Sequence, residues 1–228
     1  MSPEFVHRTR IKICGLTREA DVDAAVEAGA DAIGFVLYDK SPRHVSAERA
    51  GVLARRLPPF VTPVVLLVNA SAELRARALA AVPNALLQFH GDETPAECHS
   101  AERPFVRAAR MAPGFDLADF ARAWVPSGPQ ALLVDAHVEG YGGGGQVFDW
   151  SLLPRSGELP LPLVLSGGLH ADNVGEGIHR VRPWSVDVSS GVEDAKGIKN
   201  PDKIRQFVAA VRAYDSAWQC GYQLVDCL

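Results

Sequence analysis

Short runs of apolar and β-branched residues recur along the chain, and each is followed by a loop rich in glycine, serine, proline or aspartate and then by a helical pattern. This alternation is typical of βα units, whose strands pair in parallel. Eight such runs can be counted, at residues 10–14, 32–37, 64–68, 85–89, 105–109, 131–134, 163–165 and 185–188. Eight units favour an α/β fold with a closed (β/α)8 (TIM) barrel over an open doubly wound sheet.

Capping residues predict where helices begin and end. Ser46 is the expected N-cap of one helix, and Pro58 is expected to stop it. The apolar face of this helix has i, i+3, i+4, i+7 spacing and consists of Ala50, Leu53, Ala54 and Leu57. For the first helix, Thr17 is the expected start and Gly29 the expected end.

The last helix sets the expected end of the barrel. Asn200 is a candidate cap, Pro201 suits the first helical position, and the apolar face consists of Ile204, Phe207, Val208 and Val211. We therefore expect one barrel domain at residues 10–215, an N-terminal extension at 1–9 and a C-terminal tail at 216–228.

Composition and charge narrow the class of protein. With 228 residues and 47% hydrophobic content, the chain can bury a sizeable core. The net charge of −4 makes nucleic acid an unexpected partner. No apolar run approaches the ~20 residues that span a bilayer, and the first residues lack a signal-peptide centre, so we expect a cytoplasmic protein without membrane contact. The four cysteines show neither a C-x-x-C pair nor metal-ligand spacing, so no metal site is expected.

Two side chains at strand ends are candidates for proton transfer, because barrel enzymes place their chemistry at the carboxyl ends of the strands. Cys14 ends the first strand; it is either a small buried hydrophobe or a base, if positive potential lowers the thiol pKa from its usual ~8.5. Asp135 closes the sixth strand after three apolar residues; it either braces a loop or, partly desolvated, donates a proton to a leaving oxygen.

Three glycine-rich stretches follow the later strands. The run at 142–145, which includes Gly144, can be a plain flexible loop. The other two stretches follow the seventh and eighth strands and consist of Ser166, Gly167 and Gly168, and of Ser189, Ser190 and Gly191. Loops at these two places commonly present backbone N–H groups and a helix N-terminus to a phosphate, so they are candidate phosphate ligands.

Two further side chains follow strands and are candidates for substrate contact. Arg43 lies after the second strand, where its guanidinium can meet a carboxylate with a two-pronged hydrogen bond or stay at the surface. His90 follows the fourth strand and either contacts substrate or fixes its own loop.

Six motifs together resemble the phosphoribosylanthranilate isomerase family, in the family's order. They are KICGLT, SPRHV, QFHGDE, VDAHVEGYGGGGQVFDW, LSGGL and DVSSGVE. The resemblance implies a (β/α)8 barrel that carries out, without a cofactor, the Amadori rearrangement of N-(5'-phosphoribosyl)anthranilate to 1-(o-carboxyphenylamino)-1-deoxyribulose 5-phosphate in tryptophan biosynthesis. It also implies a monomer or a homodimer.

The resemblance assigns roles to matching residues. Asp135 matches the general acid that protonates the furanose oxygen, and Cys14 matches the general base that removes the C2' proton. Arg43 matches the group that holds the anthranilate carboxylate, and the SGG and SSG loops match the phosphate ligands. Asp187 and Glu193 border the second of these loops, and either positions substrate or braces the loop; Asp187 is the preferred candidate. The family more often has other residues where this chain has Phe89, Gly144 and Ser166.

Two other interpretations stay open. One is the histidine-pathway isomerase, which resembles a two-fold repeated barrel with an aspartate at both catalytic strand ends; here the first strand ends in Cys14, and no second phosphate motif is visible in the N-terminal half. The other is a barrel that has lost catalysis and only binds a phosphate ligand. A pure binder needs phosphate loops but neither an acid nor a base.

Overall fold

A computed structural model describes residues 8–136, 149–150, 153–154 and 158–225, with side chains described as far as residue 217. Eight parallel strands form a closed barrel in sequence order, and β1 pairs with β8 to close it. The strands are β1 (Arg10–Cys14), β2 (Ala32–Val36), β3 (Thr62–Leu67), β4 (Leu86–Phe89), β5 (Phe105–Met111), β6 (Ala131–Ala136), β7 (Leu163–Leu165) and β8 (Ser185–Val188). The predicted (β/α)8 barrel and all eight of its predicted runs are confirmed.

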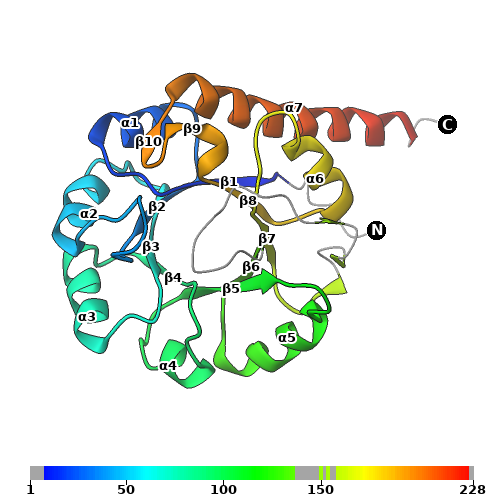
Figure 1. Ribbon diagram of the computed structural model, residues 1–228. Coiled ribbons are helices and arrows are strands. Elements are labelled where there is room, and N and C mark those ends of the chain that lie inside the picture. Colours follow the sequence, from blue (N-terminus) through cyan, green and yellow to red (C-terminus); the bar gives the residue numbers. More distant parts are fainter. Residues whose placement is uncertain (1–7, 137–148, 151–152, 155–157, 226–228) are drawn as a thin grey trace.

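Helices form an outer ring around the barrel (Figure 1). They are α1 (Glu19–Glu27), α2 (Ala47–Ala54), α3 (Ala72–Ala81), α4 (Pro95–His99), α5 (Leu117–Trp124), α6 (Val174–Val181) and α7 (Pro201–Val225). After β8 the chain makes a 3-10 turn, η4 (Ser190–Val192), and a short hairpin of β9 (Glu193–Ala195) and β10 (Ile198–Lys199). Among the described residues, no helix is long and apolar enough to cross a membrane.

The predicted caps hold in part. Ser46 Oγ accepts a hydrogen bond from Arg49 N, and Gly29 follows α1 with a φ of 93°, as expected of residues that start and end helices. The prediction that Thr17 starts α1 is wrong, since the N-cap of this helix is Arg18. The Thr17 hydroxyl instead donates to Gly197 O at 2.8 Å, because the β9–β10 hairpin lies against this loop.

The predicted end of α2 was also wrong. The helix ends at Ala54, and Leu57, expected on its apolar face, belongs to a following turn in which Leu57 N donates to Ala54 O. Because the residue before a proline is disfavoured in helical conformation, the influence of Pro58 reaches back into this turn. The strand bounds differ less from the prediction. Strands β5 and β6 each extend two residues further than expected and pair as far as Met111 and Ala136, which places Asp135 within the sheet.

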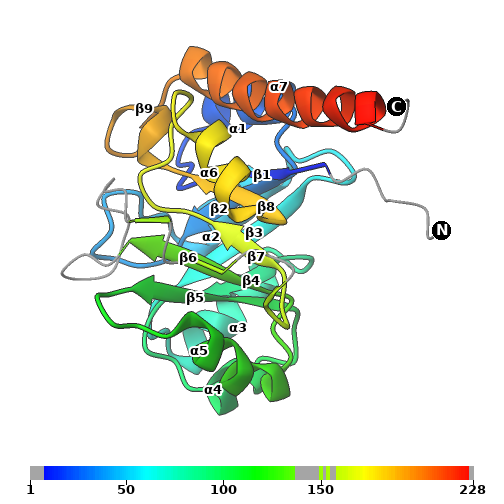
Figure 2. The ribbon, with the colours of Figure 1, turned by 90° about the vertical axis from the view of Figure 1, so that its right-hand side faces the viewer.

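The last helix begins as predicted and continues beyond residue 215, at which the barrel was expected to end. Asn200 Oδ1 accepts hydrogen bonds from the backbone N of residues 202 and 203, and the predicted apolar face of Ile204, Phe207, Val208 and Val211 is buried. Thr9 N and Oγ1 both donate to the carboxylate of Asp215, which ties the start of the barrel to this helix. Figure 2 shows α7 projecting past the barrel.

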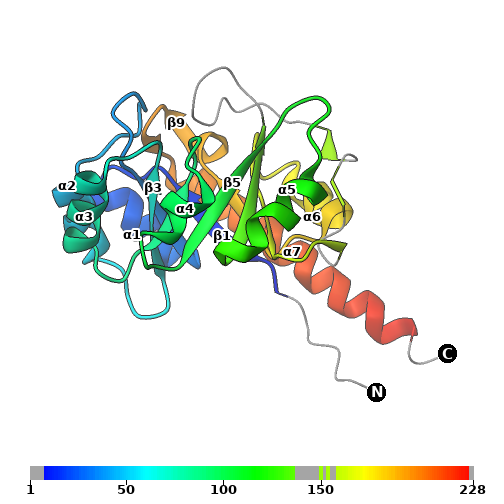
Figure 3. The same ribbon diagram turned by 90° about the horizontal axis from the view of Figure 1, so that it is seen from below.

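The barrel interior is layered by the alternation of side chains along each strand. One small apolar cluster consists of Val106, Ala108, Ala131, Leu133 and Val164, and a second consists of Cys14, Val36, Leu66 and Val68. The second cluster lies at the carboxyl ends of its strands, the end at which Figure 3 shows β9 and the loop after β2. The interior at this end is therefore where a ligand can meet inward-facing polar groups.

Candidate active site

A cavity at the carboxyl ends of the strands brings together most of the predicted site residues. Its lining includes side chains from β1, β4, β6 and β8 and from the loops after β2, β7 and β8. The lining residues are Cys14, Val36, Tyr38, Ser41, Arg43, Leu66, Val68, Gln88, His90, Asp135, Ser166, Asp187 and Ser189. Because β7 and β8 lie between β6 and β1 in the closed barrel, Cys14 and Asp135 face a ligand from different sides.

Cys14 is a buried free thiol at the end of β1. Its neighbour on β2 is Gly34, and a Cβ there would lie 2.7 Å from Cys14 Sγ, so glycine leaves room for the sulfur. Burial raises the pKa of the Cys14 thiol above its ordinary value, Lys12 and Lys199 lower it, and Asp187 raises it, with a net rise. The two ammonium groups supply the positive potential that a basic thiol requires, but burial outweighs their effect on its pKa.

Lys12 and Asp187 form a buried ion pair below Cys14. Lys12 Nζ lies 2.9 Å from Asp187 Oδ2, and the two residues are register partners in β1 and β8. The contact has ion-pair distance without hydrogen-bond angles, and among the described residues neither Lys12 Nζ nor Asp187 Oδ1 has a hydrogen-bond partner. The pair therefore places a buried ammonium, balanced by one carboxylate, beside the Cys14 thiol.

Lys12→Met should move the alkylation of Cys14 by iodoacetamide to higher pH. Loss of the ammonium leaves burial and Asp187, which both raise the thiol pKa, less opposed. Below that pKa the thiolate fraction, and with it the alkylation rate, falls about tenfold for each unit by which the pKa rises. Mass spectrometry of the labelled peptide against pH measures the shift.

The double variant Lys12→Met/Asp187→Asn is the control, because it removes both charges of the pair. Its profile should lie closer to that of the wild type than the profile of Lys12→Met does, since Asp187 raises the thiol pKa. An unchanged profile in Lys12→Met would show that the ammonium has no part in setting the thiol pKa.

Asp135 is buried at the end of β6 with one oxygen fixed and the other facing a histidine. Asp135 Oδ1 accepts a hydrogen bond from Ala136 N at 2.9 Å, and Asp135 Oδ2 lies 3.4 Å from His90 Nε2. Gln88 Nε2 lies 3.1 Å from His90 Nδ1. When the Gln88 amide nitrogen donates to Nδ1, the ring N–H is at Nε2, the atom that faces Asp135. The His90 ring thus lines the cavity and lies beside the Asp135 carboxylate. Its contact with substrate stays a prediction.

Arg43 lies over the loop after β1 and pairs with Glu193. Its Nε and Nη2 each lie 2.8 Å from an oxygen of the Glu193 carboxylate, and both side chains are buried. A Cβ at Gly15 would lie 2.4 Å from Arg43 Cδ, so glycine at that turn lets the arginine stem pass. Arg43 is therefore a fixed cation in the cavity wall, not a solvated surface side chain.

The two loops predicted to bind phosphate lie against each other. A Cβ at Gly191 would lie 1.9 Å from Leu169 O, so only glycine allows this approach. Gly167 has a φ of 88°, and a Cβ there would lie 3.0 Å from Asp135 Oδ1. Gly168 also has positive φ, and Ser190 begins η4. The glycines thus bring both loops close to each other and to the candidate acid.

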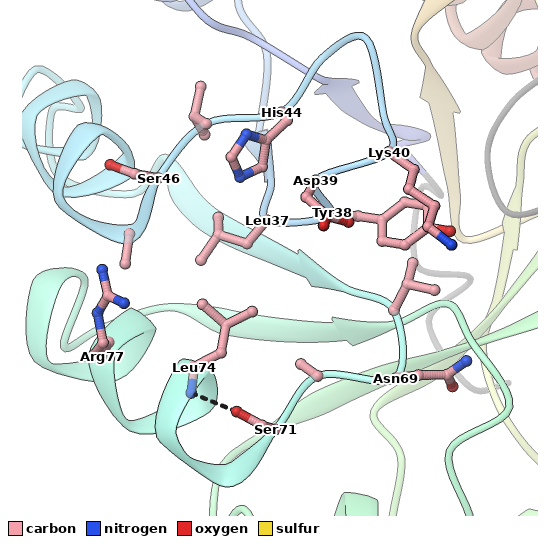
Figure 4. Close-up of a pocket in the computed structure, with 14 residues that line it drawn as sticks. Leu37, Tyr38, Asp39, Lys40, His44, Ser46, Asn69, Ser71, Leu74 and Arg77 are labelled. Atoms are coloured by element: carbon pink, nitrogen blue, oxygen red, sulfur yellow. Dashed lines mark hydrogen bonds between the residues drawn. The ribbon is translucent and has the colours of Figure 1, made fainter.

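A separate groove of about 590 Å³ lies beside this cavity, between the loops after β2 and β3 (Figure 4). Lys40, His44, Asn69 and Arg77 lie around it, and Ser71 caps α3 through Leu74 N. It is larger than the cavity but contains neither Cys14 nor Asp135. The smaller cavity is therefore the candidate active site, since both the candidate acid and the candidate base line it.

Of the predicted site residues, Gly144 lies outside the described residues. Sequence reasoning assigned no role to Lys12, Gln88 or Lys199. Lys12 and Gln88 stand two residues before Cys14 and His90, so the period-2 alternation of a strand was the signal that they face inward. Among the described residues, no group of three His, Cys, Asp or Glu side chains is placed to hold a metal ion.

Comparison with known proteins identifies relatives along nearly the whole chain. Residues 11–210 match the family described as N-(5'phosphoribosyl)anthranilate (PRA) isomerase. The chain is 68% identical over 209 residues to the N-(5'-phosphoribosyl)anthranilate isomerase of Methylibium petroleiphilum, covering 92% of this chain and 96% of the relative. It is 66% identical to the enzyme of the same name from Leptothrix cholodnii, covering 92% and 93%.

Solved structures agree with the sequence matches. The phosphoribosyl anthranilate isomerase of Thermotoga maritima superposes with a TM-score of 0.80 at 39% identity, covering 90% of this chain and 99% of the other. A structure of the enzyme in complex with reduced 1-(o-carboxyphenylamino)-1-deoxyribulose 5-phosphate gives a TM-score of 0.75 at 36% identity, with the same coverage. The chain belongs to the N-(5'-phosphoribosyl)anthranilate isomerase family.

Proposed function

We propose that this isomerase of tryptophan biosynthesis converts N-(5'-phosphoribosyl)anthranilate to 1-(o-carboxyphenylamino)-1-deoxyribulose 5-phosphate, with Asp135 as general acid and Cys14 as general base. The observation that carries the assignment is that a carboxyl group and a thiol from well-separated strands line one buried cavity. An aldose–ketose rearrangement needs a proton given to one atom and taken from another, and this placement supplies both.

The first step uses Asp135. Its proton passes to the furanose ring oxygen, the C1'–O bond breaks, and the electron pair on the anilino nitrogen forms the C=N bond of a Schiff base. The hydrogen bond from Ala136 N holds one carboxyl oxygen, and His90 faces the other, so the donor has a fixed orientation. Fixed geometry of this kind lowers the entropic cost of proton transfer.

The second step uses Cys14. Its thiolate removes the proton from C2', and the C–H electron pair moves toward the protonated imine to give an enol-amine. Tautomerisation of the enol-amine then gives the ketose. The ammonium of Lys12 and, further off, that of Lys199 stabilise the thiolate against the cost of burial.

Substrate binding is assigned to the remaining polar groups. We infer that the loops containing residues 166–168 and 189–191 bind the phosphate through backbone N–H groups, and that Arg43 binds the anthranilate carboxylate. His90 and Asp187 complete the polar wall around the ribose. We also propose that Gly144 contacts the substrate, as the sequence predicts.

The reaction is tested by following the fluorescence of freshly made phosphoribosylanthranilate. Loss of the signal is expected with the wild-type protein, and the histidine-pathway aminoaldose should not turn over, because β1 ends in a thiol where that enzyme has a carboxylate. Folded protein without turnover of the first substrate would contradict the proposal and favour a barrel that only binds phosphate ligands.

Location and assembly follow from the same proposal. Cys14 and Cys98 are free thiols, which suits a reducing compartment, so we infer a cytoplasmic enzyme. The partner is the small-molecule substrate, without nucleic acid or membrane, and the protein is expected to be a monomer or a homodimer. One solved structure of a relative is described as mutually generated monomers of the dimeric enzyme from Thermotoga maritima.

A further inference from the structure

Glu193 joins two parts of the site that lie in different loops. Each of its carboxylate oxygens accepts a hydrogen bond from Arg43, at 2.8 Å. Glu193 Oε1 also accepts one from Lys199 Nζ at 2.8 Å. The side chains of Glu193 and Lys199 are 5% and 0% exposed, so all three charges interact with little screening by water. One carboxylate is thus shared by two buried cations.

Lys199 continues the connection to the loop after β8. Its ammonium donates to Ser189 O at 3.0 Å and lies 3.2 Å from Ser189 Oγ. The Ser189 hydroxyl in turn donates to Cys14 O at 2.9 Å. Contacts therefore run without a gap from Arg43 through Glu193 and Lys199 to the loop assigned to phosphate and to the backbone of the candidate base.

The hairpin that carries Glu193 and Lys199 is itself fixed. Glu193 and Lys199 are register partners in β9 and β10. Asn200 N donates to Val192 O at 2.9 Å, and Lys203 Nζ donates to Glu193 O at 2.7 Å. Because the backbone on both sides is tied down, the Glu193 carboxylate is a rigid reference point for the side chains that it contacts.

The geometry at Arg43 leaves it able to bind an anion. Glu193 uses Nε and one N–H of Nη2, which is one edge of the guanidinium. The opposite edge, formed by Nη1 and the second N–H of Nη2, keeps the spacing that matches a carboxylate. Arg43 and Lys199 share the single carboxylate of Glu193, so the three side chains together retain one positive charge. Arg43 also lines the cavity.

We propose that Glu193 is a positioning residue that turns the edge of Arg43 formed by Nη1 and Nη2 toward the substrate carboxylate and, through Lys199, holds the phosphate loop in place. The inference rests on the proposed function, since it takes the substrate to be an anthranilate carrying a ribose phosphate. Preference for the carboxylated ligand then comes from the orientation of Arg43, whereas Lys199 supports the loop that binds the phosphate of both ligands.

The test compares two ligands by calorimetry in the whole protein. One is reduced 1-(o-carboxyphenylamino)-1-deoxyribulose 5-phosphate, and the other is the same compound without the carboxyl group. The wild type should prefer the first by at least ~10-fold, as expected for a charge-assisted two-pronged bond. Glu193→Gln should reduce this preference by ~5-fold or more, because the guanidinium loses its orientation.

Lys199→Met separates the two halves of the network. It leaves both bonds between Arg43 and Glu193 in place but removes the contacts to Ser189. Affinity for both ligands should therefore fall by a similar factor, about 5-fold, with their ratio nearly unchanged. A loss confined to the carboxylated ligand in this variant would overturn the link to the phosphate loop.

Glu93→Gln is the matched control. Glu93 also forms a buried ion pair with an arginine, Arg107, but that pair lies outside the cavity lining. The variant should lose thermal stability as Glu193→Gln does and keep the ligand preference. Should Glu193→Gln fail to fold, Glu193→Asp keeps the charge but is one methylene too short for both bonds, and a reduced preference is again expected.

The possible results are distinct. A preference that is unchanged in the Glu193 variants, with normal wild-type turnover, overturns this inference and leaves the proposed function standing. A preference that increases shows that Glu193 competes with the ligand carboxylate for Arg43, which also overturns it. A wild type that neither turns over substrate nor binds the reduced product overturns the proposed function first.

Discussion

Cys14→Ala is expected to lower kcat by about 10³-fold, within the range of a lost general base. The thiol lines the cavity at the end of β1, and the part of the lining that the structure describes contains no other thiol. Alanine fits beside Gly34 without a clash, so folding should be retained. Steady-state fluorescence assays give kcat, and calorimetry with the reduced product should show binding within about threefold of the wild type, because the base acts after binding.

Cys98→Ala is the matched control for this prediction. Cys98 is the second buried free thiol and lies in α4, outside the cavity lining. Burial raises its pKa to about 12, so it is an inert core side chain and not a base. The variant should keep kcat within about twofold while losing some stability to the small cavity it creates. A near wild-type kcat in Cys14→Ala would show that the Cys14 thiol is not the general base.

The pH dependence of the wild type should report the same group. Because burial raises the pKa of Cys14, kcat/KM on the acidic side should increase with pH as the thiolate becomes populated. The cations nearby counteract burial only in part. If Cys14 is the base, the acidic limb of the profile should therefore lie above the pH expected for an unperturbed thiol.

Alternation and capping made most of the barrel predictable. Most strands are short, largely apolar runs followed by a loop rich in glycine, serine, proline or aspartate, and such local signals do not depend on distant contacts. Thr17 shows the limit of this reasoning. As a residue ahead of a helix it has the right chemistry for a cap, but its hydroxyl donates to Gly197 O, which lies 180 positions later in the chain. Tertiary contacts overrode the local preference.

The site was predictable in its chemical groups and less so in their pairing. Cys14, Asp135 and Arg43 stand at strand ends or loops that any barrel turns toward its mouth. That Arg43 would bond to Glu193, or that Lys12 would pair with Asp187, depends on which strands close the barrel and on the hairpin after β8. Sequence spacing of 150 residues between Arg43 and Glu193 contains no signal for such a contact.

Asp135→Asn should lower kcat by about 10³-fold while the reduced product still binds, because an amide cannot donate a proton to the ring oxygen. The substitution retains an oxygen that can accept the hydrogen bond from Ala136 N, so the end of β6 should be retained. Stopped-flow and steady-state fluorescence measure the loss. Calorimetry with the reduced product separates a chemical effect from a binding effect.

Asp92→Asn is the matched control. Asp92 is an exposed carboxylate on the loop that carries His90, and it pairs with Arg110 outside the cavity lining. Its replacement changes the same net charge and should leave kcat within about twofold, since exposed ion pairs contribute little. A large loss in both variants would indicate that net charge near the cavity mouth, and not proton donation, governs the rate.

His90 provides the decisive alternative for the acid. Its Nε2 lies 3.4 Å from Asp135 Oδ2 and carries the ring proton when Gln88 donates to Nδ1. If Asp135→Asn kept a wild-type kcat while His90→Asn lost it, the donor to the ring oxygen would be the imidazole, and the carboxylate would only orient it. If His90→Asn lowers kcat far less than Asp135→Asn does, the proton comes from Asp135, and the histidine only orients the carboxyl group toward the ring oxygen.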